Sequence, residues 1–375
     1  MDWWPFLVSA VCAGMLMPLA IQARSIGHGE LHGIQRLHDV PTSRLGGVVV
    51  VVACAITMAM VLSYAPDTLF VGLPLVLAVV PVVLFGLAED VTREVRPRYR
   101  MAAAVLSAML ASAYSGGIVP RLDLPFVDGL LQHMWFVLPL TWFMVAGACN
   151  AMKLIDGGHG LAGGTAVIML GGIALAAGMS ADLVTLTTAL VVMGALVGFL
   201  CWNYPRGQVF LGDAGAYFIG FMYAELSIHL IARNSEISPW YVIMLAGFPI
   251  VDTLLAMYRR AVVRHAPLMA PDALHLHSLV FRRIVMPIER RQAPMDVVRA
   301  NARVAPRLWV HSILCLALAV LFRDNTPALW LGLAAYTVFY VYQYRELVLF
   351  RGRRARHLGA AALKGTSRVK RPNVL

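Results

Sequence analysis

Long apolar runs recur along the whole 375-residue chain and constrain its fold more than any other feature. A helix needs about 20 mostly apolar residues to cross a bilayer. The composition agrees with many crossings, because 59% of the residues are apolar and only 14% are charged, whereas a soluble domain carries roughly 25% charged residues. We therefore predict an all-α, polytopic integral membrane bundle with about eleven transmembrane helices. The predicted spans are 3–21, 45–64, 69–88, 101–119, 134–149, 161–179, 182–202, 211–231, 240–257, 308–322 and 328–346.

Basic residues are distributed unevenly between these spans. With the N-terminus outside, alternate polar segments face the cytoplasm and hold all but three of the 31 lysines and arginines, if Arg345 is counted with the tail that it adjoins. The exceptions are Arg121, Arg233 and Arg323. Because positive charge marks cytoplasmic loops, we predict that the N-terminus is outside and the C-terminus inside. The polar chemistry then lies on the cytoplasmic face.

The remaining composition narrows the class of protein. We predict one transmembrane domain over residues 1–350 and a basic tail over 351–375 that lies on anionic lipid. The net charge of +11 is explained by topology and membrane lipids, with no nucleic acid. The five cysteines have no metal-type spacing, and the first span lacks a cleavage site and is retained. A transporter would more often carry ionisable groups in mid-span, where this chain is almost wholly apolar.

Two polar segments combine basic residues with helix-start or acidic signals. Arg44 precedes Gly46 and Gly47, where free backbone N–H groups and a guanidinium could bind an anion. The alternative is a basic flank followed by a turn. Glu89 and Asp90 precede several arginines, an arrangement that suits a metal or base site beside a phosphate clamp. An ordinary charged loop would look the same.

A third polar segment, Asn150 to Gly164, lies between two long apolar runs. Asn150, Lys153 and Asp156 are spaced by three, so they share one face if the helix continues through them. An amide, a cation and a carboxylate suit a ribose, a phosphate and a sugar hydroxyl. A helix end with glycine punctuation explains the glycines but not these three side chains.

Two later segments add an acid and imidazoles. Asp213 opens an apolar helix in a Gly-Asp-x-Gly pattern, either as its N-cap or as a Mg²⁺ ligand beside a diphosphate, and we expect it at a solvent-facing loop edge. His275 and His277 suit phosphate contacts or proton transfer, and a zinc site would lack a third ligand nearby. Five polar segments on one face thus supply acids, guanidinium groups and imidazoles. That set indicates phosphoryl transfer, in which catalysis is mostly positioning and charge neutralisation.

In order, the motifs are His38…Pro41-x-x-Arg44-x-Gly-Gly, Glu89-Asp90, Asn150-Ala-x-x-x-x-Asp156-Gly, Phe210-Leu-Gly-Asp213-x-Gly and His275-x-His277. Together they resemble the polyprenyl-phosphate N-acetylhexosamine-1-phosphate transferases of glycosyltransferase family 4. The resemblance covers roughly residues 38–283. It favours the branch that initiates cell-envelope glycans such as lipopolysaccharide and O-antigen over the peptidoglycan enzyme.

The resemblance implies an activity and a partner set. Such an enzyme moves a sugar-1-phosphate from a UDP-sugar to undecaprenyl phosphate in the bacterial inner membrane, with Mg²⁺ or Mn²⁺, and a homodimer is compatible with it. The implied catalytic residues are Asp90, Glu89, Asp156, His275 and His277, and the implied metal ligands are Asp213 and Asp90. The implied substrate-binding residues are Arg44, Arg98, Arg100, Asn150, Lys153, His159, Asn203 and Gly212.

Four positions depart from the family pattern. Glu89 stands where Asp is usual, Lys153 where Asn is common, His159 where Asp or Asn is common, and Ser278 where a third His is common. They leave a variant substrate or a weakened activity open. Two rival readings follow: a membrane transporter of a lipid-linked or small solute, and a non-catalytic paralogue that binds lipid or nucleotide.

Overall fold

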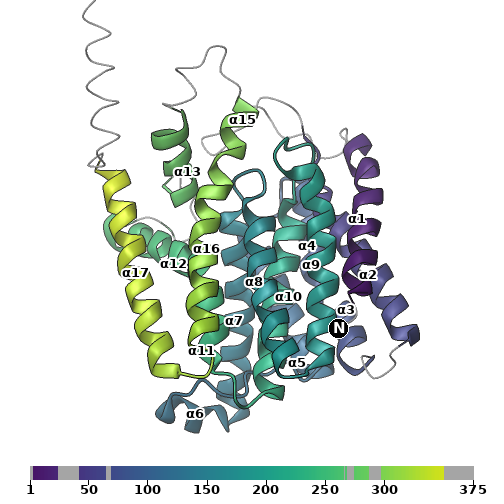
Figure 1. Cartoon of the computed structure of the whole chain (residues 1–375), viewed down its shortest axis with the longest axis vertical. Helices are drawn as coiled ribbons and strands as arrows, with labels where there is room; N and C mark the ends of the chain where they lie inside the picture. The colour runs from purple at the N-terminus through teal and green to yellow at the C-terminus, as the bar shows by residue number, and fades with distance from the viewer. Residues whose placement is uncertain are drawn as a thin grey trace, which may run out of the picture.

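The computed structural model describes residues 3–23, 42–64, 69–265, 267, 274–286 and 297–349. In these ranges the chain is a bundle of helices, and its one extended pairing is an isolated bridge between Ser43 and Val209. His38, Pro41 and the tail 351–375 lie outside the described residues. The long helices run alongside one another (Figure 1). They are α1 (Trp4–Gln22), α2 (Gly46–Tyr64), α3 (Leu69–Ala78), α4 (Val80–Thr92), α5 (Pro97–Tyr114), α7 (Met134–Ile155), α8 (Leu161–Met179), α9 (Leu183–Asn203), α10 (Gly212–Arg233), α16 (Val304–Leu321) and α17 (Thr326–Val348). Helix α12 (Gly247–Tyr258) lies across this direction (Figure 1).

Shorter elements close the two ends of the bundle. Helix α6 (Pro125–Leu131) lies at the bottom of Figure 1, while α13 (Leu276–Val280) and α15 (Val297–Ala302) lie at the top. Helix α11 (Pro239–Leu245) precedes α12, and π-helical turns follow α12 at Arg259–Val263 and α13 at Phe281–Val285.

Helix α10 is the centre of the bundle. Its residues from Gly212 to Ile231 are buried, and it packs against α2, α4, α7 and α8. Small residues permit these close approaches. A Cβ on Gly47 of α2 would lie 2.3 Å from Gly215 Cα, and one on Gly86 of α4 would lie 2.5 Å from Ala214 Cα. Larger side chains at these positions would push the helix starts apart.

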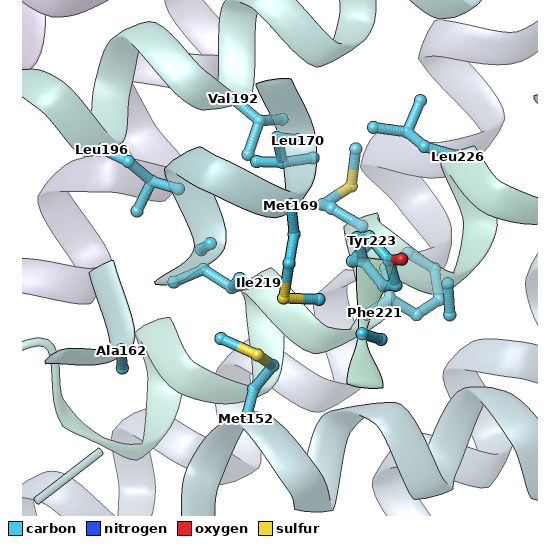
Figure 2. Packing of buried hydrophobic residues seen from close by; sticks show 14 of the residues in the cluster. Met152, Ala162, Met169, Leu170, Val192, Leu196, Ile219, Phe221, Tyr223 and Leu226 are labelled. Atoms are coloured by element: carbon cyan, nitrogen blue, oxygen red, sulfur yellow. The ribbon is translucent and has the colours of Figure 1, made fainter. Parts of the chain in front are cut away.

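The core around α10 is filled by aliphatic, methionine and aromatic side chains. Figure 2 shows Met152 of α7, Met169 of α8 and Ile219 of α10 meeting in this region, and each of these side chains is almost fully buried. Unbranched methionine side chains fill irregular gaps between crossing helices.

Every one of the eleven predicted spans is helical, but the number of crossings stays a prediction. Among the residues that the structure describes, eight helices are long and apolar enough to cross a membrane, or nine if the bent pair α11–α12 is one span. Helices α5 and α17 fall short in apolar composition. Helix α17 nevertheless runs along the bundle (Figure 1), and α5 leads from Arg100, which contacts Asp213, toward Val119, which donates to Thr141 of α7.

Two expectations about the spans are wrong. The segment 240–257 is not one straight helix, since α11 and the helix that follows it meet at 73°. The mid-span regions, expected to be almost wholly apolar, contain a buried acid: Glu225 of α10 is 0% exposed, and neither of its carboxylate oxygens has a hydrogen-bond partner. His229, one turn further on, is also buried.

Candidate active site

The site begins where two chain segments pair in front of α2 and α10. Phe210 N donates to Ser43 O at 2.8 Å, Gly46 N to Phe210 O at 3.0 Å and Gly47 N to Leu211 O at 2.8 Å. The free N–H groups that we expected to bind an anion at this Gly-Gly helix start are therefore already used. Of that expected anion site, Arg44 remains, with a side chain that is 32% exposed.

Asp90 joins α4 to the start of α10. It is 1% exposed, and its carboxylate accepts hydrogen bonds from Asp213 N and Ala214 N, both at 2.9 Å. Arg44 Nη1 lies 3.5 Å from the same carboxylate. A carboxylate on free N–H groups at a helix N-terminus is stabilising. Gly212 is required beside it, because its φ is +73° and a Cβ there would lie 2.5 Å from Asp90 Oδ2.

Asp213 carries two ion pairs in the first turn of α10. Lys153 Nζ of α7 lies 2.5 Å from Oδ1, and Arg100 of α5 pairs with Oδ2. Arg100 also lies 3.7 Å from Glu89, whose other oxygen accepts a hydrogen bond from Val95 N at 3.0 Å. The expected solvent-facing position is wrong, since Asp213 is 3% exposed where these helix ends meet over it. We call Arg44, Asp90, Arg100, Lys153 and Asp213 the charged cluster, and their end of the bundle the charged end.

Asp156 follows the end of α7, and the charges of the charged cluster act on its carboxyl. Burial raises the pKa of its carboxyl to about 7, the nearby Asp213 and Asp90 act in the same direction, and Arg44 and Lys153 oppose them. Asn150 lies one turn before Lys153 on the same helix. The predicted common face of Asn150 and Lys153 therefore exists, and the helix ends at Ile155, just before Asp156.

The two histidines of the predicted fifth segment lie beside the turn that follows Asp156. The rings of His275 and His277 stack with centroids 5.7 Å apart. A Cβ on Gly157 would lie 2.2 Å from His277 Nε2, so this ring packs against the turn after Asp156. Burial, and then the charge of His275, lower the pKa of His277 to about 4, so it is neutral at pH 7.

Sequence reasoning missed the residues that hold His275. Its Nδ1 lies 2.8 Å from Asp252 Oδ2, and Tyr340 O–H donates to Asp252 Oδ1 at 2.6 Å. Asp252 lies within a predicted span. An acid in a span with no partner nearby in the sequence indicates a functional position, and this signal could have identified Asp252.

Three of the expected substrate-binding residues have other roles in the structure. Asn203 is 4% exposed and braces the fold, accepting from Gly160 N at 2.6 Å and donating to Val209 O at 2.7 Å. His159 is 1% exposed and contacts Pro205 O at 3.1 Å, and burial lowers its pKa to about 4. Arg98 is exposed and packs over the Tyr99 ring, away from the charged cluster.

A preformed metal site is not evident in the part of the chain that the structure describes, where no group of three or more His, Cys, Asp or Glu residues is arranged to hold an ion. Asp213 still fits a Mg²⁺ ion shared with a substrate, because a carboxylate oxygen in one ion pair keeps another lone pair. Mg²⁺ commonly takes one or two carboxylates together with phosphate oxygens. The two oxygens of Asp90 fit less well, since both already accept backbone N–H groups.

Fold and site together define a polytopic helical membrane protein whose polar loops build one buried, ion-paired site at one end. Comparison with known proteins identifies the family. Residues 72–231 match the model of glycosyl transferase family 4, which confirms the resemblance predicted from the sequence. The matched segment contains Asp90, Lys153 and Asp213 but neither Arg44 nor the two histidines.

Relatives with similar sequences carry two kinds of name. The chain is 28% identical over 282 residues to a Bacillus subtilis protein named "Probable undecaprenyl-phosphate N-acetylglucosaminyl 1-phosphate transferase", covering 72% of this chain and 75% of that protein. An Escherichia coli O157:H7 undecaprenyl-phosphate alpha-N-acetylglucosaminyl 1-phosphate transferase is 24% identical over 69% of this chain and 71% of its own length. A Desulforudis audaxviator phospho-N-acetylmuramoyl-pentapeptide-transferase is 29% identical over 66% and 79%.

Proposed function

We propose that the chain transfers an N-acetylhexosamine-1-phosphate from a UDP-sugar to undecaprenyl phosphate, giving undecaprenyl-diphospho-sugar and UMP. This reaction would initiate a cell-envelope glycan at the cytoplasmic face of a bacterial inner membrane. The single observation that carries the proposal is the charged cluster, in which Lys153 and Arg100 from two helices converge on Asp213 of a third. The names of the relatives support the same class of donor and acceptor.

The proposed chemistry is an in-line displacement. An oxygen of the lipid phosphate attacks the β-phosphorus of the UDP-sugar, a new O–P bond forms, and the bond to the bridging oxygen breaks so that UMP leaves with both electrons of that bond. Arg44, which is partly exposed, is placed to bind the lipid phosphate. Lys153 and Arg100 are placed to offset negative charge that develops on the diphosphate.

We propose that Asp90 does not handle the proton. Both oxygens of Asp90 accept N–H groups of α10, so its contribution is to hold Asp213 in position. A phosphate monoester loses its second proton near pH 6, so the attacking group is largely ionised at neutral pH. Asp156 is better placed for any remaining proton transfer or for a sugar hydroxyl, because the pKa of its carboxyl is about 7.

We further propose that Asp213 holds a Mg²⁺ ion together with diphosphate oxygens. A bound Mg²⁺ supplies positive charge that neutralises phosphate oxygens. The chain's own contribution is to keep one carboxylate fixed at the start of α10 with two cations beside it.

A direct assay tests the function. Purified protein is incubated with undecaprenyl phosphate, Mg²⁺ and each member of a panel of UDP-sugars, beginning with UDP-GlcNAc. We expect UMP release and a lipid-linked product whose mass identifies the sugar. The absence of UMP with every donor would overturn the enzymatic proposal, and nucleotide or lipid binding without turnover would indicate a non-catalytic paralogue.

A transporter remains the second candidate because two specific features favour it. Glu225 is buried within α10 without a hydrogen-bond partner, and α11 and α12 form a bent pair. Buried acids and broken helices are typical of transport sites. Transport of a substrate into proteoliposomes without UMP formation would favour this alternative.

A further inference from the structure

The turn 157–160, which joins α7 to α8 directly after Asp156, depends on other parts of the chain for its shape. Three of its four residues are glycines, and glycine loses more conformational freedom on folding than any other residue. The backbone N–H groups of His159 and Gly160 donate to side chains that lie far away in the sequence. The conformation of the turn, and with it the position of Asp156, is therefore set by those side chains.

Asn301 of α15 holds the first half of the turn. Its Oδ1 accepts a hydrogen bond from His159 N at 3.1 Å. A Cβ on Gly158 would lie 3.2 Å from the same oxygen, so the amide lies directly against the turn. Asn301 is 0% exposed, and a buried N–H group that loses its acceptor is destabilising.

Trp309 of α16 holds the second half of the turn. Its indole Nε1 donates to Gly160 O at 3.2 Å, and its ring centroid lies 5.2 Å from that of Tyr204. The indole reaches the turn because α16 packs along α8 and a Cβ on Gly164 of α8 would overlap the indole ring. The glycine at this position therefore permits the hydrogen bond to Gly160.

The position of the turn matters because of the residue that precedes it. Asp156 is close enough to Lys153 and Asp213 for their charges to act on its carboxyl. A displacement of roughly 1 Å within a reacting assembly lowers the rate by about 100-fold. A turn that is free to move would thus displace Asp156 from the groups around which the diphosphate is expected to bind.

We propose that Asn301 and Trp309 are positioning residues for the sugar-nucleotide donor, because they fix the turn 157–160 and so set where Asp156 meets the UDP-sugar. This inference rests on the proposed function and adds two residues that lie beyond residue 231, where the match to the family model ends. The lipid phosphate is assigned to Arg44, on a different segment. Loss of either contact therefore weakens donor binding and leaves acceptor binding unchanged.

Two matched pairs of variants test the proposal. Trp309→Phe removes the indole N–H and keeps an aromatic ring, and Trp240→Phe makes the same change at the opposite end, where Trp240 Nε1 donates to Leu122 O at 2.9 Å. Asn301→Leu and Asn234→Leu form the second pair, since both asparagines are buried. We expect the first member of each pair to raise the KM for the UDP-sugar roughly five-fold, the effect of one lost hydrogen bond. The KM for undecaprenyl phosphate should stay unchanged, and both controls should leave both constants unchanged.

Hydrogen–deuterium exchange of the full-length protein in nanodiscs measures the turn without turnover. We expect UDP-GlcNAc to slow exchange of the peptide that contains residues 157–160 in the wild type, and Trp309→Phe and Asn301→Leu to speed exchange there and weaken this protection.

A rise in both KM values, or an equal rise in the control variants, would indicate a general loss of packing and overturn the proposal. Faster exchange with an unchanged KM for the UDP-sugar would also overturn it, because the two side chains would then serve the fold alone. If the wild-type protein releases no UMP, the proposed function fails, whereas protection of the turn by UDP-GlcNAc, and its loss in the two variants, still tests the positioning role.

Discussion

At the scale of single residues, the three carboxylates of the site differ in the groups that surround them. Asp90 is held by backbone N–H groups, Asp213 by Lys153 and Arg100, and Asp156 has a raised pKa beside them. Three acids that look alike in the sequence therefore have three different environments. The environments of Asp213 and Asp156 lead to the predictions that follow.

Lys153 competes with a divalent cation for Asp213. We expect Lys153→Asn to tighten binding of Mn²⁺, used as a probe for Mg²⁺, by up to roughly ten-fold, or about 1.4 kcal/mol, because one ion pair to the carboxylate is removed. Electron paramagnetic resonance of free Mn²⁺ measures this without turnover. Arg98→Gln is the control, since Arg98 lies away from the charged cluster. Unchanged Mn²⁺ affinity in Lys153→Asn would place the metal elsewhere.

Asp213 also stabilises the fold. Removing one partner of a buried ion pair costs about 3–5 kcal/mol, and because Lys153 is 28% exposed we expect about 1–3 kcal/mol for Asp213→Asn. Thermal unfolding in detergent measures the loss. We expect the double variant Asp213→Asn/Lys153→Met to recover part of the stability but no UMP release. Recovery of turnover would show that Asp213 is not a ligand of the reacting groups.

Asp156 should make activity depend on pH near neutrality. A carboxyl whose pKa is raised to about 7 is mostly neutral below that pH and anionic above it. If the anion accepts a proton from the lipid phosphate or a hydrogen bond from a sugar hydroxyl, kcat/KM rises between about pH 6 and pH 8. The folded state also keeps a proton that the unfolded chain loses, so this group costs stability as the pH rises from about 4 to 7.

The matched variants separate this group from the titrating phosphates. Asp156→Asn should flatten the part of the profile that belongs to the protein, and its gain in Tm should be larger at about pH 7.5 than at about pH 5. His159→Asn should leave the profile unchanged in this range, because the pKa of His159 is already lowered to about 4. A profile of identical shape in wild type and Asp156→Asn would assign the titration to the substrates.

At the scale of elements, helices were easier to predict than their contacts. Apolar runs marked each of the long helices, because burial in lipid or protein requires an apolar surface either way. The break between α11 and α12 was missed, since hydropathy does not report a change of direction. The family resemblance implied that Asn203 binds substrate, and the sequence alone does not distinguish an amide that braces the fold from one that binds substrate. Asp252 was missed because its partners, His275 and Tyr340, lie far away in the chain.

Asp252 is a positioning residue for His275. We expect Asp252→Asn to lower kcat by roughly ten-fold or more with a small change in KM for the UDP-sugar, because the imidazole loses its carboxylate partner. The imidazole NMR shifts of His275, assigned with His275→Gln, measure the change directly. Tyr340→Phe, which removes one contact to the same carboxylate, should have a weaker effect in the same direction. Unchanged His275 shifts in Asp252→Asn would reject the positioning role.

At the scale of the whole molecule, the gathering of polar segments at one end is the most informative agreement between sequence and structure. Residues from the first, second, third and fourth polar segments meet around Asp213, and His277 of the fifth packs against Gly157. The alternation of basic loops predicted this, because each crossing returns the chain to the same side. Which side of the membrane that is stays a prediction.

Reporter fusions measure the orientation. We expect alkaline phosphatase inserted between Gly116 and Asp123, at the opposite end from the charged cluster, to be active, and green fluorescent protein after Leu375 to be fluorescent. An insertion of alkaline phosphatase at Arg264 should be inactive. Activity at Arg264 together with inactivity near Gly116 would reverse the orientation and place the site outside.

The position of the charged cluster at one end of the bundle has a kinetic consequence under the proposed function. A water-borne nucleotide sugar reaches the charged end along the bundle axis, whereas the carrier lipid arrives at a right angle from the bilayer. Neither route blocks the other, so either substrate can be the first to bind. Initial-rate patterns should then be those of a random sequential reaction, and the rate should follow the surface density of carrier in the membrane rather than its bulk concentration.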